Sequence, residues 1–172
     1  MNNFYENIYE LESFYRNELL KIEKHRTKYN IGEEQFVKQR LLESNLEMIF
    51  YKEKACAKDD GIDFVFKYNN EIYICQLKYW KKSLGLKQIK VIYGDMFFSE
   101  LAIKYRNNNM NTKYILICPF LNAKCNKFLK EYSKYNYYLI ANEKFIQLIL
   151  NPTYFFEKKI YERDDLKCLK KE

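Results

Sequence analysis

Two apolar runs on either side of Asn69-Asn70, within the stretch DDGIDFVFKYNNEIYICQLKYW (59–80), constrain the fold most strongly. Asparagine tolerates the positive φ angles that a two-residue type I′ turn requires, so the two runs are predicted to form a β-hairpin. The turn also sets the register, in which Tyr68 faces Glu71 and Asp63 faces Gln76. Both faces of the hairpin are apolar, as expected for strands that are covered on both sides.

Three polar side chains interrupt this apolar pattern at the end of the hairpin away from the turn. Side chains alternate along a strand, so Gln76 and Lys78 share one face, and the predicted register adds Asp63 to them. An unpaired charge in buried sheet is costly. Either this end of the sheet is solvated or closed by an Asp63–Lys78 ion pair, or the three groups form a functional site.

The charge of the chain favours a polyanionic partner. It has 172 residues, enough for one domain with a sizeable core, a net charge of +7 and a sequence pI near 9.0. Nucleic acid is a better candidate than an anionic membrane surface, and a lysine-rich solubilising surface is the alternative. Residues 78–90 contain no acid, and their cations beyond the hairpin are Lys81, Lys82, Lys87 and Lys90.

Several classes of protein are disfavoured by the reactive residues. The five cysteines include no CxxC pair, which argues against a disulfide framework or a zinc knuckle. His25 is the single histidine, which argues against histidine-based nucleases, zinc hydrolases and Ser-His triads. No apolar run approaches the length of a membrane span. We therefore expect a soluble protein of a reducing compartment, located in the cytoplasm and without a membrane partner.

The order of predicted elements indicates an α/β fold with a mixed sheet and helices on both faces. Helices are expected over 3–28, from Gly32 to Phe50 with a break near Asn45, and over 86–106, 122–135 and 142–150, the last capped by Asn142. The hairpin, 113–120 and 137–141 are the expected strands. The tail from Pro152 has no assigned structure.

At the hairpin the chain resembles the PD-(D/E)XK nuclease superfamily, particularly its Mrr-like restriction endonuclease branch. That branch has an aspartate on the first hairpin strand and Gln-x-Lys on the second, matched here by DDGID, ending in Asp63, and by CQLKYW, with Gln76 and Lys78. It also has a glutamate early in the preceding helix, and EEQFVKQRLLE matches with Glu34, or alternatively Glu33.

The resemblance implies a restriction-endonuclease-like fold, with three α/β/α layers around a central mixed sheet of about four to five strands. The nuclease domain would span 30–150, after an N-terminal helix at 1–29 and before a C-terminal tail at 151–172 packed on the same domain. Of the local signals, D…QxK alone is weak. Its order, the hairpin register and the upstream glutamate together are more specific.

The activity implied is metal-dependent cleavage of DNA, in preference to RNA, by an endonuclease of the restriction or defence type. Mg²⁺ or Mn²⁺ would be held by Asp63, the Gln76 side chain, the Leu77 carbonyl and Glu34, and Lys78 would orient water or offset charge. Lys81, Lys82, Lys87 and Lys90 are the expected phosphate contacts, and Trp80 either stacks on a base or packs locally.

Two other classes of function remain open. The first is a catalytically weak nucleic-acid-binding module of the same fold, acting within a larger complex. The second is a structural role, in which the acidic, aromatic helix 3–22 pairs subunits into a homodimer. Four matching site residues, Glu34, Asp63, Gln76 and Lys78, favour the nuclease.

Overall fold

The computed structural model describes residues 17, 32–51, 62–78, 85–118, 131–141 and 143–163. The chain divides into two compact units, one made of residues 1–44 and 143–172 and the other of residues 45–142. The predicted domain boundaries near residues 29 and 150 remain predictions.

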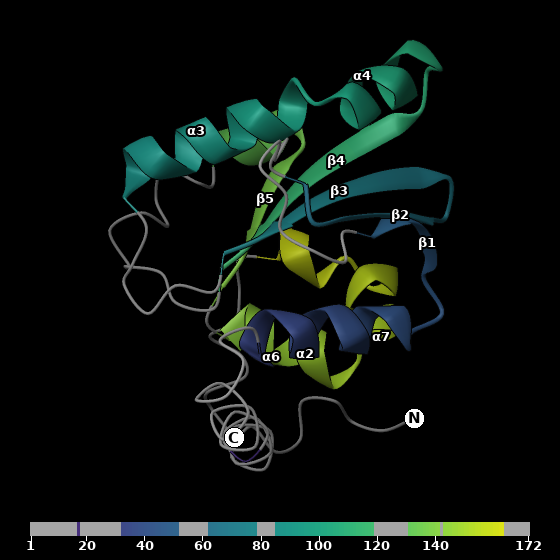
Figure 1. Cartoon of the computed structure of the whole chain (residues 1–172), viewed down its shortest axis with the longest axis vertical. Coiled ribbons are helices and arrows are strands. Elements are labelled where there is room, and N and C mark those ends of the chain that lie inside the picture. The colour runs from purple at the N-terminus through teal and green to yellow at the C-terminus, as the bar shows by residue number, and fades with distance from the viewer. Residues whose placement is uncertain are drawn as a thin grey trace. The chain divides into compact units, whose positions relative to one another are not determined.

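Residues 45–142 contain a five-stranded mixed sheet, which confirms the predicted α/β class (Figure 1). Its strands are β1 (Glu47–Tyr51), β2 (Phe64–Tyr68), β3 (Glu71–Leu77), β4 (Asn111–Ile117) and β5 (Tyr137–Ile140). They lie in the order β1-β2-β3-β4-β5. The first three strands pair antiparallel, and β4 and β5 continue the sheet parallel to β3.

The hairpin of β2 and β3 forms around the predicted turn. Asn69 and Asn70 have φ angles of 50° and 62°, the left-handed conformation that a type I′ turn needs at both central positions. Tyr68 pairs with Glu71, and the ladder continues in this register to Phe64 opposite Cys75. The predicted turn and register are therefore confirmed over β2.

Residues 47–51 form a strand, whereas the sequence predicted that the preceding helix extends to Phe50. Helix α2 (Gly32–Leu42) ends earlier, and β1 pairs antiparallel with β2. Isoleucine and aromatic side chains favour strands, and pairing with β2 satisfies the backbone better than an extended helix. The pairing shifts register between Met48 and Phe50, so Ile49 forms a bulge in β1.

The segment that follows the hairpin forms two helices in place of the single helix predicted over 86–106. These are α3 (Leu86–Phe97) and α4 (Glu100–Asn107). The break falls at Ser99, whose hydroxyl oxygen accepts the N–H of Ala102 at 3.3 Å and so caps α4. A serine at this position competes with the helical hydrogen bonds of the chain before it.

Helix α3 covers one face of the sheet in this unit. Its buried residues Ile89 and Met96 belong to one apolar cluster with Val65, Ile74 and Leu116 of the sheet. Because β3 and β4 are parallel, the connection between them must return along the sheet (Figure 1). The first turn of α3 therefore lies at the carboxyl end of β3, and its last turn lies at the amino end of β4.

The later elements of the unit agree with the prediction apart from their ends. Strand β4 begins two residues before the predicted 113–120, and β5 ends one residue before the predicted 137–141. Within the predicted helix 122–135, the structure describes 131–135, which end in the 3₁₀ helix η1 (Ser133–Tyr135).

The other unit is helical in its described part. It contains α2, α6 (Glu143–Leu150), α7 (Pro152–Glu157) and the 3₁₀ helix η2 (Ile160–Glu162). The Arg40 side chain joins α2 to α6, because its Nε and Nη2 donate to the carbonyls of Ile149 and Leu150 at 2.8 and 3.0 Å. The segment from Pro152, for which the sequence predicted no structure, begins with the helix α7. Asn142, the residue predicted to cap α6, lies outside the described residues.

No helix among the described residues is both long enough and apolar enough to span a bilayer.

Candidate functional site

Asp63 lies one residue before β2, at the point where the β2–β3 ladder stops. Its N–H donates to the carbonyl of Cys75 at 2.9 Å, although Cys75 is also the residue paired with Phe64. Two successive residues, Asp63 and Phe64, thus bond or pair with one residue of β3, as in a β-bulge. The ladder ends before the predicted Asp63–Gln76 pair, and the carboxylate is placed by another contact.

That contact is a hydrogen bond to the backbone of β3. The Asp63 Oδ2 accepts the N–H of Leu77 at 2.6 Å, a short bond of the charge-assisted kind. Leu77 is buried, and the carboxylate gives its N–H an acceptor beyond the last β2–β3 pair. The bond therefore holds one carboxylate oxygen of Asp63 against the last residue of β3.

Gln76 and Lys78 flank this point along the chain. Gln76 is 6% exposed and shares its face of β3 with Ile72 and Ile74, the face that α3 covers. Lys78 is half-buried, and its N–H donates to the carbonyl of Ile117 at 2.8 Å, which extends the β3–β4 ladder by one residue. The backbone that carries both side chains is thus fixed on both sides of Leu77.

The negative charge of Asp63 affects the pKa of Cys75, the residue before Gln76 on β3. The pKa of the Cys75 thiol is raised well above its ordinary value, first by complete burial and then by the charge of Asp63. Cys75 is therefore a neutral thiol at physiological pH, and a cysteine nucleophile at this position is disfavoured.

The remaining predicted site residues are described only in part. Glu34 and its alternative Glu33 lie within α2, and the side chains of both fall outside the described residues. Lys87 and Lys90 lie exposed on α3. Trp80, Lys81 and Lys82 lie in 79–84, also outside the described residues. The structure thus brings Asp63 to the Gln76–Lys78 segment and leaves the other contributions as predictions.

The donors at this end of β3 suit a hard cation. A carboxylate, a side-chain amide and a backbone carbonyl offer oxygen ligands, and Mg²⁺ commonly takes few protein ligands and keeps several waters. The Leu77 N–H orients the carboxylate from behind, as outer hydrogen bonds commonly do for ligands of metals. Within the described ranges, no three side chains of the His, Cys, Asp or Glu types gather, so a metal here would rely on neutral oxygens as well.

The sequence did not predict how Asp63 is anchored. Alternation along β3 and the hairpin register predicted that Asp63 lies near Gln76 and Lys78. The hydrogen bond from the Leu77 N–H to Asp63 could not be predicted in this way, because it depends on where the β2–β3 ladder stops. No family model, no curated protein and no solved structure matches the chain.

Proposed function

We propose that the chain is a metal-dependent endonuclease that hydrolyses phosphodiester bonds of DNA, of the restriction or defence type, with a restriction-endonuclease-like three-layer fold. The observation that carries the proposal is the bond from Asp63 Oδ2 to the Leu77 N–H. It sets a carboxylate beside the strand segment that presents Gln76 and Lys78. A mixed sheet in which a hairpin is followed by a helical crossover to a parallel strand also supports the proposal.

The proposed metal ligands are all oxygen atoms. Asp63 would supply the negative charge, and Gln76 and the Leu77 carbonyl would supply neutral oxygens. Glu34, which belongs to the other unit of the structure, stays a prediction from the sequence as a further ligand, bound directly or through water. A divalent cation such as Mg²⁺ or Mn²⁺, when bound there, supplies Lewis acidity and a more acidic water. Gln76 contributes no charge, so the affinity for metal should be lower than at a site with two or three carboxylates.

The chain's own cations act on the substrate. The Lys78 ammonium would orient water or offset the charge that develops on the phosphoryl oxygens, and preorganised charge of this kind is commonly the largest catalytic contribution. Lys87 and Lys90, with Lys81 and Lys82, would contact phosphates and fix the position of the strand without reading its sequence. Trp80 is a candidate for stacking on a base.

A catalytically weak nucleic-acid-binding module is the second candidate, and one observation favours it. The Asp63 carboxylate satisfies a backbone N–H of β3, so this residue has a structural role that a protein without catalysis would also keep. A homodimer and a cytoplasmic location remain predictions from the sequence.

Cleavage of supercoiled plasmid DNA tests the proposal. Wild-type protein should nick or linearise the plasmid with Mg²⁺ or Mn²⁺ and leave it intact with EDTA. Asp63→Asn and Lys78→Ala should each reduce the rate by orders of magnitude. The matched controls are Glu157→Gln and Lys158→Ala, which remove one exposed charge of each sign at the C-terminal end of α7 and should cleave like wild type.

The outcomes separate the two candidates. A binding module would retain DNA affinity in Ca²⁺ and show no metal-dependent cleavage by wild type. Cleavage at the wild-type rate by Asp63→Asn would rule out the assigned site. The same assay with linear DNA and with RNA tests the preference for DNA.

A further inference from the structure

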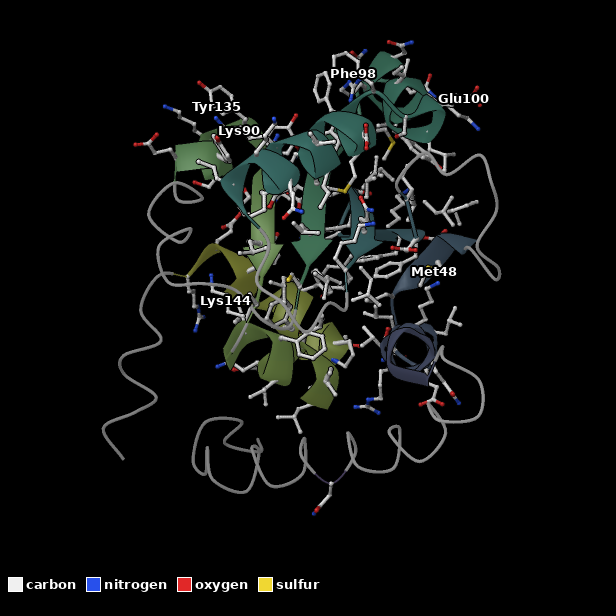
Figure 2. All side chains as sticks on the ribbon, turned by 60° about the vertical axis from the view of Figure 1, so that its left-hand side comes forward. Met48, Lys90, Phe98, Glu100, Tyr135 and Lys144 are labelled. Carbon is white, nitrogen blue, oxygen red and sulfur yellow. The ribbon has the colours of Figure 1, made fainter. Side chains whose placement is uncertain are left out.

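The outer face of α3 has an unusual set of exposed side chains. The helix buries Ile89, Ile92, Tyr93 and Met96 against the sheet. Its opposite side exposes Phe98 at 73% and Val91 at 57%, the two most exposed apolar side chains apart from Tyr135 in the described structure. Lys87 and Lys90 are exposed on the same helix, and Figure 2 shows Phe98 pointing away from the sheet.

These residues form a continuous strip. At 3.6 residues per turn, Phe98 projects within about 20° of Lys87, and Gly94 lies about 20° to the other side. A Cβ placed on Gly94 would meet no atom within 4 Å, so the helix surface is open between the cations and the ring. The strip from Lys87 to Phe98 is about 16 Å long, from the helical rise of 1.5 Å per residue.

The strip starts on the side of the sheet where β3 ends. The first turn of α3, with Lys87, lies at the carboxyl end of β3, where Lys78 also lies. Phe98 lies at the other end of the crossover, towards the start of β4. A strand of nucleic acid that left the site along α3 would meet Lys87 and Lys90 first and Phe98 last.

The Phe98 ring is supported from behind. It meets the ring of Phe97 edge-on, at 5.1 Å between centroids and 84° between planes. The guanidinium of Arg106 stacks on Phe97 at 3.8 Å from its centroid and donates to the Tyr114 hydroxyl. An exposed ring that rests on a packed aromatic group offers a defined surface for stacking.

We propose that the outer face of α3 binds single-stranded nucleic acid, with Lys87 and Lys90 on phosphates and Phe98 stacked on an unpaired base. Bases within a duplex already stack on one another, whereas an exposed ring stacks on a base of a single strand with little dependence on sequence. The direction of the strand, from the Asp63 end towards Phe98, rests on the proposed nuclease site. The binding itself rests only on the exposed residues of α3.

Three substitutions of Gly94 test the strip with minimal effect on folding. Alanine, glutamate and lysine all favour a helix more than glycine does, and the position has open space, so each variant should fold at least as stably as wild type. Binding of a fluorescent oligo(dT) is measured with EDTA present, so that no cleavage occurs. Gly94→Ala should bind like wild type, Gly94→Glu about threefold or more weakly at low salt, and Gly94→Lys more tightly.

The salt dependence gives an independent readout. Gly94→Lys should steepen the slope of log K against log salt by about 0.7, the value for one added phosphate contact on a single strand. The difference between the glutamate and lysine variants should shrink in about 1 M salt, where screening acts within a few ångströms. Asp95, exposed on the flank of the strip, opposes binding, so Asp95→Asn should bind slightly more tightly.

Substitutions of Phe98 test stacking. Phe98→Ala should weaken oligo(dT) binding about tenfold, and Phe98→Tyr should retain it, because aromatic stacking on a base is worth roughly that much. Blunt duplex DNA of the same length should be affected much less by either change. Phe98→Trp adds a fluorophore whose emission should be quenched by oligo(dT) and not by the duplex.

The proposal is overturned if wild type does not bind oligo(dT), if the Gly94 variants bind alike, or if Phe98→Ala weakens duplex and single strand equally. A change in sedimentation on Gly94→Glu without a change in affinity would instead assign the face to a second copy of the chain. The two proposals can also fail separately. If wild type does not cleave plasmid DNA but Gly94→Glu and Phe98→Ala weaken oligo(dT) binding, this inference stands and the nuclease proposal fails. If wild type cleaves but the Gly94 variants all bind oligo(dT) equally, the nuclease proposal stands and this inference fails.

Discussion

Asp63 combines a structural and a proposed catalytic role, and two substitutions separate them. Asparagine keeps an oxygen that can accept the Leu77 N–H and removes the charge. Alanine removes both. If the nuclease proposal is correct, both variants lose cleavage by orders of magnitude, and only the alanine variant also loses most of the stabilisation of the hairpin end.

The magnitude follows from the geometry at Leu77. The bond from its N–H to Asp63 Oδ2 is 2.6 Å long, and Leu77 is 3% exposed, so water cannot easily replace the carboxylate. A buried donor left without an acceptor costs about 1–3 kcal/mol. For a chain of this size each kcal/mol corresponds to about 2–4 °C in Tm, which predicts a fall of about 4–8 °C for a cost of about 2 kcal/mol. Asp63→Asn exchanges a charge-assisted bond for a neutral one and should lose about half as much.

Thermal melting followed by circular dichroism measures the stability, and hydrogen exchange of the Leu77 amide locates the effect. That amide should exchange much faster in Asp63→Ala than in wild type and only slightly faster in Asp63→Asn. Glu157→Ala, at the exposed last residue of α7, controls for the loss of a carboxylate. An unchanged Tm together with an unchanged Leu77 exchange rate in Asp63→Ala would refute the structural reasoning.

Three further predictions concern buried polar contacts elsewhere. Lys113 Nζ and Glu71 Oε2 are 3.0 Å apart, and their side chains are 5% and 18% exposed. Lys113→Met or Glu71→Gln alone should therefore lower the free energy of unfolding in urea by about 2–3 kcal/mol. The double variant should lose less than the sum of the two single losses. Arg40→Lys cannot reproduce both bonds to the end of α6 and should cost about 1–2 kcal/mol in thermal unfolding. Burial raises the pKa of Tyr93 far above its ordinary value of 10.0, with smaller contributions from nearby tyrosines and a cysteine. The unfolded phenol therefore ionises first, so the stability that Tyr93 provides is complete below about pH 10 and is lost as the pH rises above it, and Tyr93→Phe should lessen that loss.

The hairpin could be predicted from the sequence because its determinants are local. Two asparagines at the turn fix the positive φ angles, and the turn fixes the register over β2. Strand β1 could not be predicted in the same way. Its residues follow a helical pattern without a strong stop signal, and their strand conformation depends on pairing with β2, 13 to 20 residues further along the chain.

The candidate site shows the same division between local and non-local causes. That Gln76 and Lys78 share a face follows from alternation along one strand. The position of the Asp63 carboxylate does not, because it depends on where the ladder stops and on which backbone N–H the carboxylate then meets. The exposure of Phe98 likewise depends on the break at Ser99, which ends α3 just before the ring.

The bulge at Ile49 affects how the protein behaves at high concentration. Among the described strands β1 is an edge of the sheet, and a regular edge offers a row of N–H and C=O groups on which another chain can build. The register shift between Met48 and Phe50 puts those groups out of step, so a strand from a neighbouring molecule could pair with only part of β1. The bulge thus disfavours edge-to-edge aggregation of a chain whose strands are rich in aromatic and β-branched residues.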